Sequence, residues 1–297
     1  MALKDILVGT DPSSAGEGRL KLAVNLARAH RAHVTACYVM QEEHGAPVGP
    51  ILPGVPVNPG PGVLIAPETR TTAGDPASAP VPPVSREAER AEQVEELFRT
   101  ELRAHGIGGE WHLFSPGETA ALIDLAKSFD LTVLGQLSPE IRSTGFRPDE
   151  IVIATGRPVL MIPYAGTFDT VGRRALVAWD GTREAARAVN DALPLLGQAE
   201  AVTVMYVGAQ EASLEQHRPS MERIVRHLQR HGITAKPEET IQGDIAISDV
   251  LLSRAADLAA DLIVAGAYHH SQLREALIGG VSRELLEHMT VPVLMSH

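Results

Sequence analysis

Residues 5–11 read DILVGTD, a short apolar run that ends on an aspartate. Residues 175–180 read ALVAWD and have the same pattern, and the two closing aspartates, Asp11 and Asp180, stand 169 residues apart. A short apolar run that stops at a polar residue is typical of a buried strand in a parallel sheet. Each run is therefore predicted to be the first strand of one copy of an internal repeat.

Further matching segments follow these two runs in the same order. The dipeptides VT and YV within 34–39 recur within 202–207, and the tripeptide HGI at 105–107 recurs at 231–233. The segment DLTV at 130–133 matches DLIV at 261–264, and PVLM at 158–161 recurs unchanged at 292–295. A collinear order of this kind indicates a repeated structural unit. We therefore predict a first domain at 1–163 and a second at 174–297, joined by a polar linker.

Both copies alternate short apolar strands with amphipathic helices. We expect strands at 6–9, 34–40, 110–114, 131–134 and 159–162 in the first copy and at 176–178, 201–207, 238–241, 262–265 and 291–295 in the second, with helices at 18–29, 86–104, 118–128, 184–195, 221–231, 247–259 and 282–288. Strands that alternate with helices are typical of a parallel sheet covered on both faces. The sequence thus predicts an α/β fold with two tandem doubly wound sheets of five strands each.

The first copy is longer than the second after its second strand. The offset between matching segments falls from 168 to 126 there, so about 42 additional residues lie within 41–84. The segment 45–83 is rich in proline and glycine, nearly without charge and without a helical or strand period, which is typical of an extended or mobile loop. We favour a surface excursion without a catalytic role, and a lid or a partner-docking arm is the alternative.

The composition disfavours several classes of function. With 26 basic and 37 acidic residues, the chain of 297 residues has a net charge of −11, which opposes binding to nucleic acids and to anionic lipid. Its single cysteine, Cys37, lies in an apolar run and can form neither a disulfide framework nor a cysteine zinc site. No run of 18 apolar residues is present. We therefore expect a cytoplasmic globular protein with Cys37 as an inert core residue.

In a doubly wound sheet, ligands bind beyond the carboxyl ends of the strands, where the strand order reverses. In the second copy, this rule would place Asp180, at the end of the first strand, beside Gly266, at the end of the fourth. Gly279 and Gly280 then precede Ser282 at the start of a helix, where backbone amides favour an anion. These residues alone leave open a nucleotide site and a structural set of turn glycines with a helix cap.

Across both repeats, outside the segment 45–83, the sequence resembles the universal stress protein family. That family has a phosphate-binding pattern after its fourth strand. The pattern consists of a glycine, two residues of any kind, a second glycine, nine residues of any kind, a third glycine, and then a serine or threonine. On this chain the four positions fall on Gly266, His269, Gly279 and Gly280, so the second glycine and the hydroxyl are replaced. The resemblance implies a Rossmann-like fold similar to that of the adenine nucleotide alpha hydrolases, with strand order 3-2-1-4-5.

The resemblance also implies a ligand for the second domain. It would bind ATP or another adenine nucleotide, with Ser282 as the nearest hydroxyl and Asp180 as a contact for a ribose hydroxyl or for Mg²⁺. The candidate nucleotide-binding residues are Ala178, Asp180, Val207, Ala265, Gly266, His269, Gly279, Gly280, Val281 and Ser282. Among these, the adenine contacts fall on Ala178, Val207 and Ala265.

The first domain keeps Asp11 and Gly135 at the matching positions, but its following loop is three residues shorter. This loop leads to Pro148, which has no amide proton to give a phosphate. We therefore predict that the first domain binds no nucleotide and is the partner of the second in an intrachain pseudo-dimer. The two PVLM strands are edge strands, which proteins cover, and the resemblance implies that they pair antiparallel. A homodimer of the whole chain is left open.

No set of catalytic residues is evident in the sequence. A Walker loop and a Gly-x-Ser-x-Gly elbow are missing, and the adjacent His269 and His270 lack the spacing of a zinc site. We therefore expect a tandem universal stress protein that acts as a stress-response factor and is at most a weak ATPase. An interaction module of the same fold that binds no nucleotide is the alternative.

Overall fold

The computed structural model describes residues 2–41, 83–137, 148–267 and 280–297. Most of the predicted loop at 45–83, and with it the choice between a surface excursion and a lid, lies outside the described residues. The first half of the chain here means the residues up to 163, and the second half means those from 174 onward.

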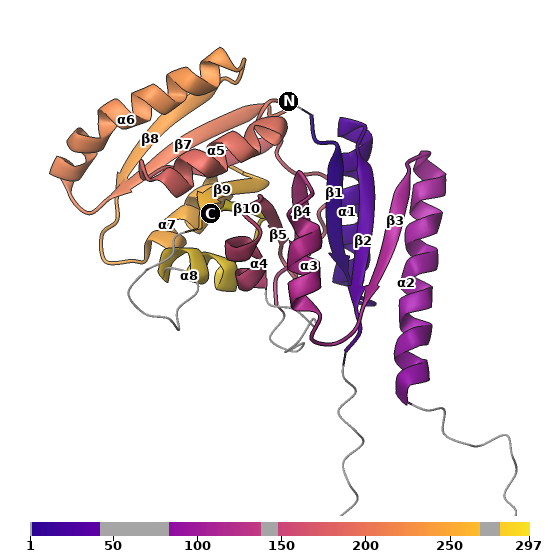
Figure 1. The fold of residues 1–297 in the computed structure, drawn as a ribbon. Helices are drawn as coiled ribbons and strands as arrows, with labels where there is room; N and C mark the ends of the chain where they lie inside the picture. Colours follow the sequence, from indigo (N-terminus) through magenta and orange to yellow (C-terminus); the bar gives the residue numbers. More distant parts are fainter. Residues whose placement is uncertain (1, 42–82, 138–147, 268–279) are drawn as a thin grey trace, which may run out of the picture.

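The described strands form a single sheet in the order β3-β2-β1-β4-β5-β10-β9-β6-β7-β8 (Figure 1). They are β1 (Asp5–Thr10), β2 (His33–Val39), β3 (Gly109–Phe114), β4 (Leu131–Gly135) and β5 (Val159–Ile162) in the first half, and β6 (Arg174–Ala178), β7 (Ala201–Gly208), β8 (Ala235–Ile241), β9 (Leu262–Gly266) and β10 (Val293–Ser296) in the second. Every pairing within a half is parallel, with the order 3-2-1-4-5. The predicted fold class is therefore confirmed.

The two halves meet through β5 and β10, which pair antiparallel as the resemblance implied. Leu160 lies opposite Leu294, the corresponding residue of the other copy, and Met161 and Val159 lie opposite Val293 and Met295. A local twofold axis thus passes through the Leu160–Leu294 pair. Because each strand covers the edge of the other, the two five-stranded sheets become one ten-stranded sheet.

Helices cover both faces of this sheet (Figure 1). The residues that pack on one face come from α1 (Ser14–His30), α2 (Pro83–His105), α5 (Arg183–Leu196) and α6 (Glu211–Arg230), and those on the other come from α3 (Thr119–Ala126), α4 (Pro148–Ala154), α7 (Ile247–Asp257) and α8 (Gly280–His288). This alternation follows from right-handed crossovers between parallel strands. None of these described helices is both long and apolar enough to cross a membrane.

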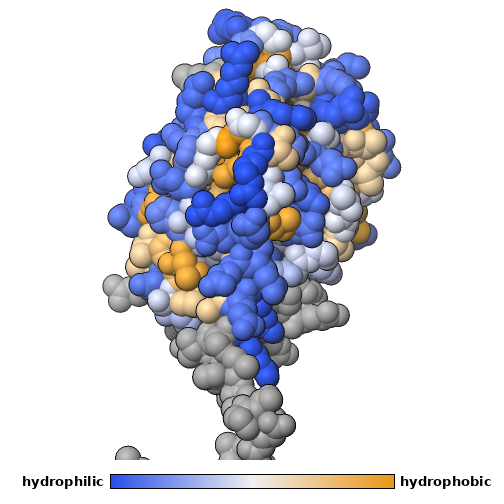
Figure 2. Space-filling model, turned by 90° about the vertical axis from the view of Figure 1, so that its right-hand side faces the viewer, coloured by the Kyte–Doolittle hydropathy of each residue, from blue (hydrophilic) through white to orange (hydrophobic). Residues whose placement is uncertain are grey.

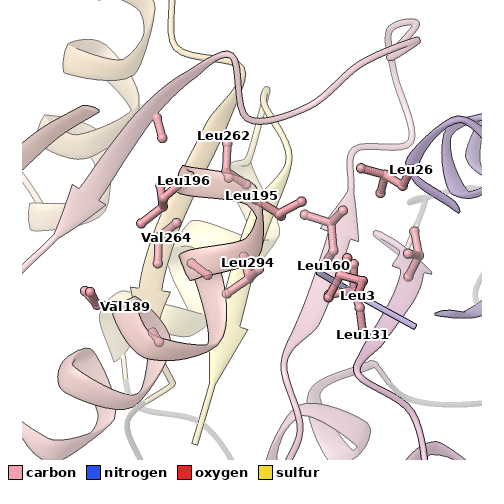
Figure 3. Close-up of a cluster of buried hydrophobic side chains, with 14 of the residues drawn as sticks. Leu3, Leu26, Leu131, Leu160, Val189, Leu195, Leu196, Leu262, Val264 and Leu294 are labelled. Carbon is pink, nitrogen blue, oxygen red and sulfur yellow. The ribbon is translucent and has the colours of Figure 1, made fainter. Parts of the chain in front are cut away.

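The hydrophobic core runs through both halves on each face of the sheet. The cluster under α1 and α5 joins Leu160 to Leu294 and Leu195, and Figure 3 shows these side chains gathered around the contact between the halves. Cys37 belongs to the cluster on the opposite face, where burial raises the pKa of its thiol to about 12. This confirms Cys37 as a core residue. Figure 2, which views the side on which α2 lies, shows a mainly hydrophilic surface with isolated hydrophobic residues.

The strands agree closely with the predicted ranges, whereas α6 begins ten residues earlier than predicted, at Glu211. Its buried residues, Met221, Ile224, Val225 and Leu228, all follow Pro219, so the helical period is visible only in that part of the sequence. The preceding turns are mostly exposed and carry no apolar stripe. The sequence analysis also missed the short helix α4, which begins at Pro148, a residue suited to the first position of a helix.

Candidate functional site

A cavity of about 480 Å³ opens at the carboxyl ends of β6, β7 and β9, and α7 and α8 form its opposite wall. It lies where the strand order of the second half reverses, which is the usual ligand position in this fold. We call it the second-half pocket. It is lined by Ala178, Trp179, Asp180, Thr182, Ala185, Met205, Tyr206, Val207, Ile247, Leu251, Ala265, Gly266, Gly280, Val281, Ser282 and Leu285.

Eight of the ten predicted nucleotide-binding residues line this pocket. They are Ala178, Asp180, Val207, Ala265, Gly266, Gly280, Val281 and Ser282. These residues come from the ends of three strands and from the first turn of α8, so the fold brings four separate segments together. The other two, His269 and Gly279, lie outside the described residues, and their roles stay predictions.

Asp180 lies at the mouth of the second-half pocket, directly after β6. Its Oδ1 accepts hydrogen bonds from the backbone amide of Thr182 at 3.0 Å and from the Thr182 hydroxyl at 2.6 Å. Thr182 in turn caps α5, because its hydroxyl accepts from the Ala185 amide at 3.2 Å. The turn between the strand and the helix is made by Gly181, with φ +78°. The Asp180 carboxylate is thus held at the surface with one oxygen already bound to the start of α5.

Gly266 ends β9 and lets α5 approach the sheet closely. A Cβ on Gly266 would lie 2.6 Å from the Ala185 nitrogen and 2.7 Å from the Glu184 carbonyl carbon. No side chain fits in such a space, so glycine is required here by packing even without a ligand. The sequence analysis had considered this glycine only for its turn and for close approach to a phosphate.

Ser282 joins α8 to the end of the same strand. Its side chain is buried, and its hydroxyl donates to the Gly266 carbonyl at 3.2 Å. The first turns of α5 and α8 therefore both adjoin Gly266, one on each side. Helix N-termini favour anions because their first amides and the helix dipole point outward. This end of the second-half pocket is accordingly suited to a phosphate.

Charge is sparse on the described wall of the second-half pocket. Asp180 is its single ionisable carboxylate, and no lysine, arginine or histidine lines the described part. Behind the wall, Glu184 is buried at the start of α5. Burial alone would raise the pKa of Glu184, but hydrogen bonds from the Arg183 side chain and from its own backbone lower it below the usual range. Helix N-termini are therefore the principal positive feature of this described wall.

Trp179 separates the second-half pocket from the opposite face of the sheet. Its ring is almost fully buried and belongs to the core cluster under α5 and α6. The indole Nε1 donates to the hydroxyl of Ser220 on α6 at 3.2 Å. The structure thus gives Trp179 a packing role beneath the pocket.

The first half has an arginine on α1 that reaches the ends of β1 and β4. The Arg19 guanidinium lies 2.6 Å from Asp11 Oδ2, and its Nε donates to the Gly9 carbonyl at 2.5 Å. A Cβ on Gly135 would collide with Arg19 Nη1. The guanidinium therefore lies on the α1 side of the sheet, at the position where the second half has the backbone of α5 against Gly266. The position that matches Arg19 at the 169-residue offset is Ala188.

Asp11 is the counterpart of Asp180, yet its environment differs. Burial alone would raise the pKa of Asp11, but Arg19 and the hydrogen bonds from Ser13 lower it below its usual value. Asp11 and Gly135 were predicted from the sequence, whereas Arg19 was not. The signal was present in the repeat, because a large cation in the first copy aligns with an alanine in the second.

The fold and the pocket define a doubly wound α/β protein whose two halves share one strand order, with a ligand-sized cavity in the second half. Residues 172–297 match the model of the universal stress protein family. This second half is accordingly a universal stress protein domain. No curated protein sequence matches the chain.

Solved structures show the same fold over nearly the whole chain. A universal stress protein from Archaeoglobus fulgidus DSM 4304 is 14% identical, with a TM-score of 0.69 over 98% of this chain and 95% of its own. A protein from Pseudomonas aeruginosa UCBPP-PA14, described as a putative universal stress protein, is 17% identical, with a TM-score of 0.57 over 99% of this chain and 93% of its own. The two-copy architecture is thus shared with proteins of very different sequence.

Proposed function

We propose that the second half binds an adenine nucleotide, ATP or a close relative, in the second-half pocket. The observation that carries this proposal is the convergence of eight predicted residues, from four separate segments, on one cavity. The cavity volume of about 480 Å³ lies within the range of small-molecule sites. The first half takes no nucleotide in this proposal, because its α4 begins at Pro148, which has no amide proton to give a phosphate.

The walls of the second-half pocket suit the three parts of a nucleotide. Ala178, Val207 and Ala265 provide a small apolar surface at the strand ends, on which a base can lie. Asp180 provides a carboxylate oxygen, Oδ2, that has no hydrogen bond within the described part of the chain. Ribose hydroxyls are natural donors to such an oxygen. The phosphates would then lie against the first turn of α8.

Asp180 is also the residue that would hold Mg²⁺. One carboxylate suits this ion, which keeps several waters and takes its remaining ligands from the phosphates of a nucleotide. Within the described ranges, no group of three or more histidine, cysteine, aspartate and glutamate side chains could form a metal site on its own. Any Mg²⁺ in this proposal therefore arrives with the nucleotide.

We infer that the chain acts in the stress response through this binding and not through catalysis. Asp180 is the only candidate general base on the described wall of the pocket, and its Oδ1 is already bound to Thr182. The acidic surface and the buried thiol of Cys37 support a place in the cytoplasm.

A second candidate function is an interaction module of the same fold that binds no nucleotide. The absence of any basic side chain from the described wall of the second-half pocket favours this alternative, because a triphosphate carries several negative charges. In that case the pocket would accept an uncharged group, such as an apolar side chain of a partner protein.

Nucleotide carried through purification distinguishes the two functions. The full chain is purified without added nucleotide and denatured, and the supernatant is analysed by mass spectrometry. The proposal expects an adenine nucleotide, retained by the wild type and lost in Ala178→Leu, which places a larger side chain at the adenine position. If neither protein carries nucleotide and neither binds added ATP, the interaction module is the function that stands.

A further inference from the structure

Helix α8 is held at one end by the second half and at the other by the first half. At its start, Ser282 donates to Gly266, and Leu285, one turn later, lines the second-half pocket. At its end, the Gln136 side chain reaches across from the first half. Gln136 Nε2 donates to the Leu286 carbonyl at 2.9 Å and to the Glu287 carbonyl at 3.0 Å.

The Gln136 amide is fixed in this orientation by its own surroundings. The residue follows β4 directly, is 7% exposed, and its backbone amide donates to the Ile162 carbonyl at 2.8 Å. Its Oε1 accepts from the Tyr164 amide at 3.2 Å. Exchanging the side-chain oxygen and nitrogen would set an oxygen against two carbonyls and an NH₂ group against a donor. All the hydrogen bonds of the side chain therefore agree on one arrangement.

This contact provides hydrogen bonds to carbonyls at the C-terminal end of α8. The last four carbonyls of an α-helix have no partner inside the helix, and α8 has only nine residues. Helices of this length are marginal without tertiary contacts. Gln136 satisfies two of these carbonyls at once and so caps the C-terminal end of α8, while the N-terminal end forms a wall of the second-half pocket.

The reverse contact, from the second half to the first, reaches no residue that lines the second-half pocket. Arg187 of α5 donates through Nη2 to the carbonyl of Gly156, just after α4. The counterpart of Gln136 in the second half is Ala267, whose methyl group cannot donate a hydrogen bond. Of these two contacts, only that of Gln136 reaches a helix that lines the second-half pocket.

We propose that Gln136 is a positioning residue for the nucleotide site of the second half, and that the first half supports that site by holding α8. The expected effect of Gln136 on nucleotide affinity rests on the proposed function, whereas its expected effect on the stability of α8 does not.

The test uses the full chain with Gln136→Met, which keeps the length of the side chain and removes its donors. Amide hydrogen exchange of residues 286–289 is measured without ligand, and ATP affinity is measured by titration calorimetry. We expect exchange of these amides to be roughly three- to tenfold faster and ATP binding to be weaker by a similar factor, since two hydrogen bonds are lost. Gln136→Glu still accepts a hydrogen bond from Tyr164 but cannot donate one, so it should show the same changes in amide exchange and ATP affinity. This variant replaces Gln136→Met in the test if the methionine variant does not fold.

Arg187→Met is the matched control, because it removes the opposite contact between the halves and leaves α8 untouched. Faster amide exchange in α8 for Gln136→Met but not for Arg187→Met supports the proposal that the first half holds α8. If the wild-type chain binds no ATP while this difference is seen, only the proposed nucleotide-binding function fails. Unchanged exchange in α8, or equal acceleration throughout the chain in both variants, overturns the proposal. An ATP affinity that stays unchanged while α8 loosens also overturns the claim that Gln136 serves the site.

Discussion

The Arg19 guanidinium lies 2.6 Å from the Asp11 carboxylate and reaches the end of β4 at Gly135. At the matching position of the second half, the backbone of Glu184 and Ala185 lies against Gly266, and no basic side chain lines the described part of the second-half pocket beside Asp180. The two halves thus share a strand order but differ in the charge beside their matching aspartates.

Removing this cation should destabilise the whole chain. Arg19→Ala leaves the Asp11 carboxylate partly buried without its partner, and breaking a buried ion pair costs about 3 kcal/mol. Urea unfolding measures the change in the free energy of unfolding. Arg28→Ala, on the exposed side of the same helix, is the control and should change little. Equal and small losses of unfolding free energy in the two variants would show that the Arg19–Asp11 pair contributes nothing to stability.

The same pair predicts a dependence on pH. Because the folded chain lowers the pKa of Asp11 below its ordinary value of 3.8, the contribution of the pair is fully present above pH 3.8 and is lost as the pH falls through the lowered pKa. The difference in unfolding free energy between the wild type and Asp11→Asn should thus stay constant from pH 7 to about pH 4 and shrink below it. A difference that grows as the pH falls would contradict this sign.

Gly266 and Gly280 both line the second-half pocket but should respond differently to a methyl group. Gly266→Ala places a Cβ 2.6 Å from the Ala185 nitrogen, whereas a Cβ on Gly280 meets nothing within 4 Å. We expect Gly266→Ala to lower the free energy of unfolding by about 2 kcal/mol through overpacking. Gly280→Ala should leave it unchanged within about 0.5 kcal/mol. Thermal unfolding of the ligand-free proteins checks both, and equal stabilities would remove the packing role of Gly266.

The segment 45–82 should be dispensable for folding. The connection from β7 to α6 in the second half consists of residues 209–210 alone, and the same strand order forms there. Because the cost of closing a loop changes by only about 0.6 kcal/mol for each doubling of its length, a short Gly/Ser replacement should leave the melting temperature nearly unchanged. Loss of the folded protein on replacement would instead show that the segment covers apolar surface.

Local sequence patterns predicted the strands and the fold well, since the inner strands are apolar runs that occur in both copies, whereas the outer strands β3 and β8 are half-exposed and more polar. The first ten residues of α6 were missed because they lack an apolar stripe and precede Pro219. Arg19 was missed because its partner, Asp11, lies outside its helix, although the alignment with Ala188 could have revealed it. The contact of Gln136 with α8 spans about 150 residues and depends on how the halves pair, so no local pattern contains it.

Titration calorimetry of ATP into the wild type, Gly280→Val and Gly18→Val shows whether the second-half pocket holds the nucleotide. Both glycines lie near the start of a helix and have open space at the Cβ position, but only Gly280 lines the second-half pocket. We expect the wild type and Gly18→Val to bind one ATP per chain with the same affinity, and Gly280→Val to bind at least roughly tenfold more weakly because its side chain obstructs the phosphates. Equal ATP binding by all three proteins, or a second bound ATP in the first half, would show that the nucleotide does not bind in this way.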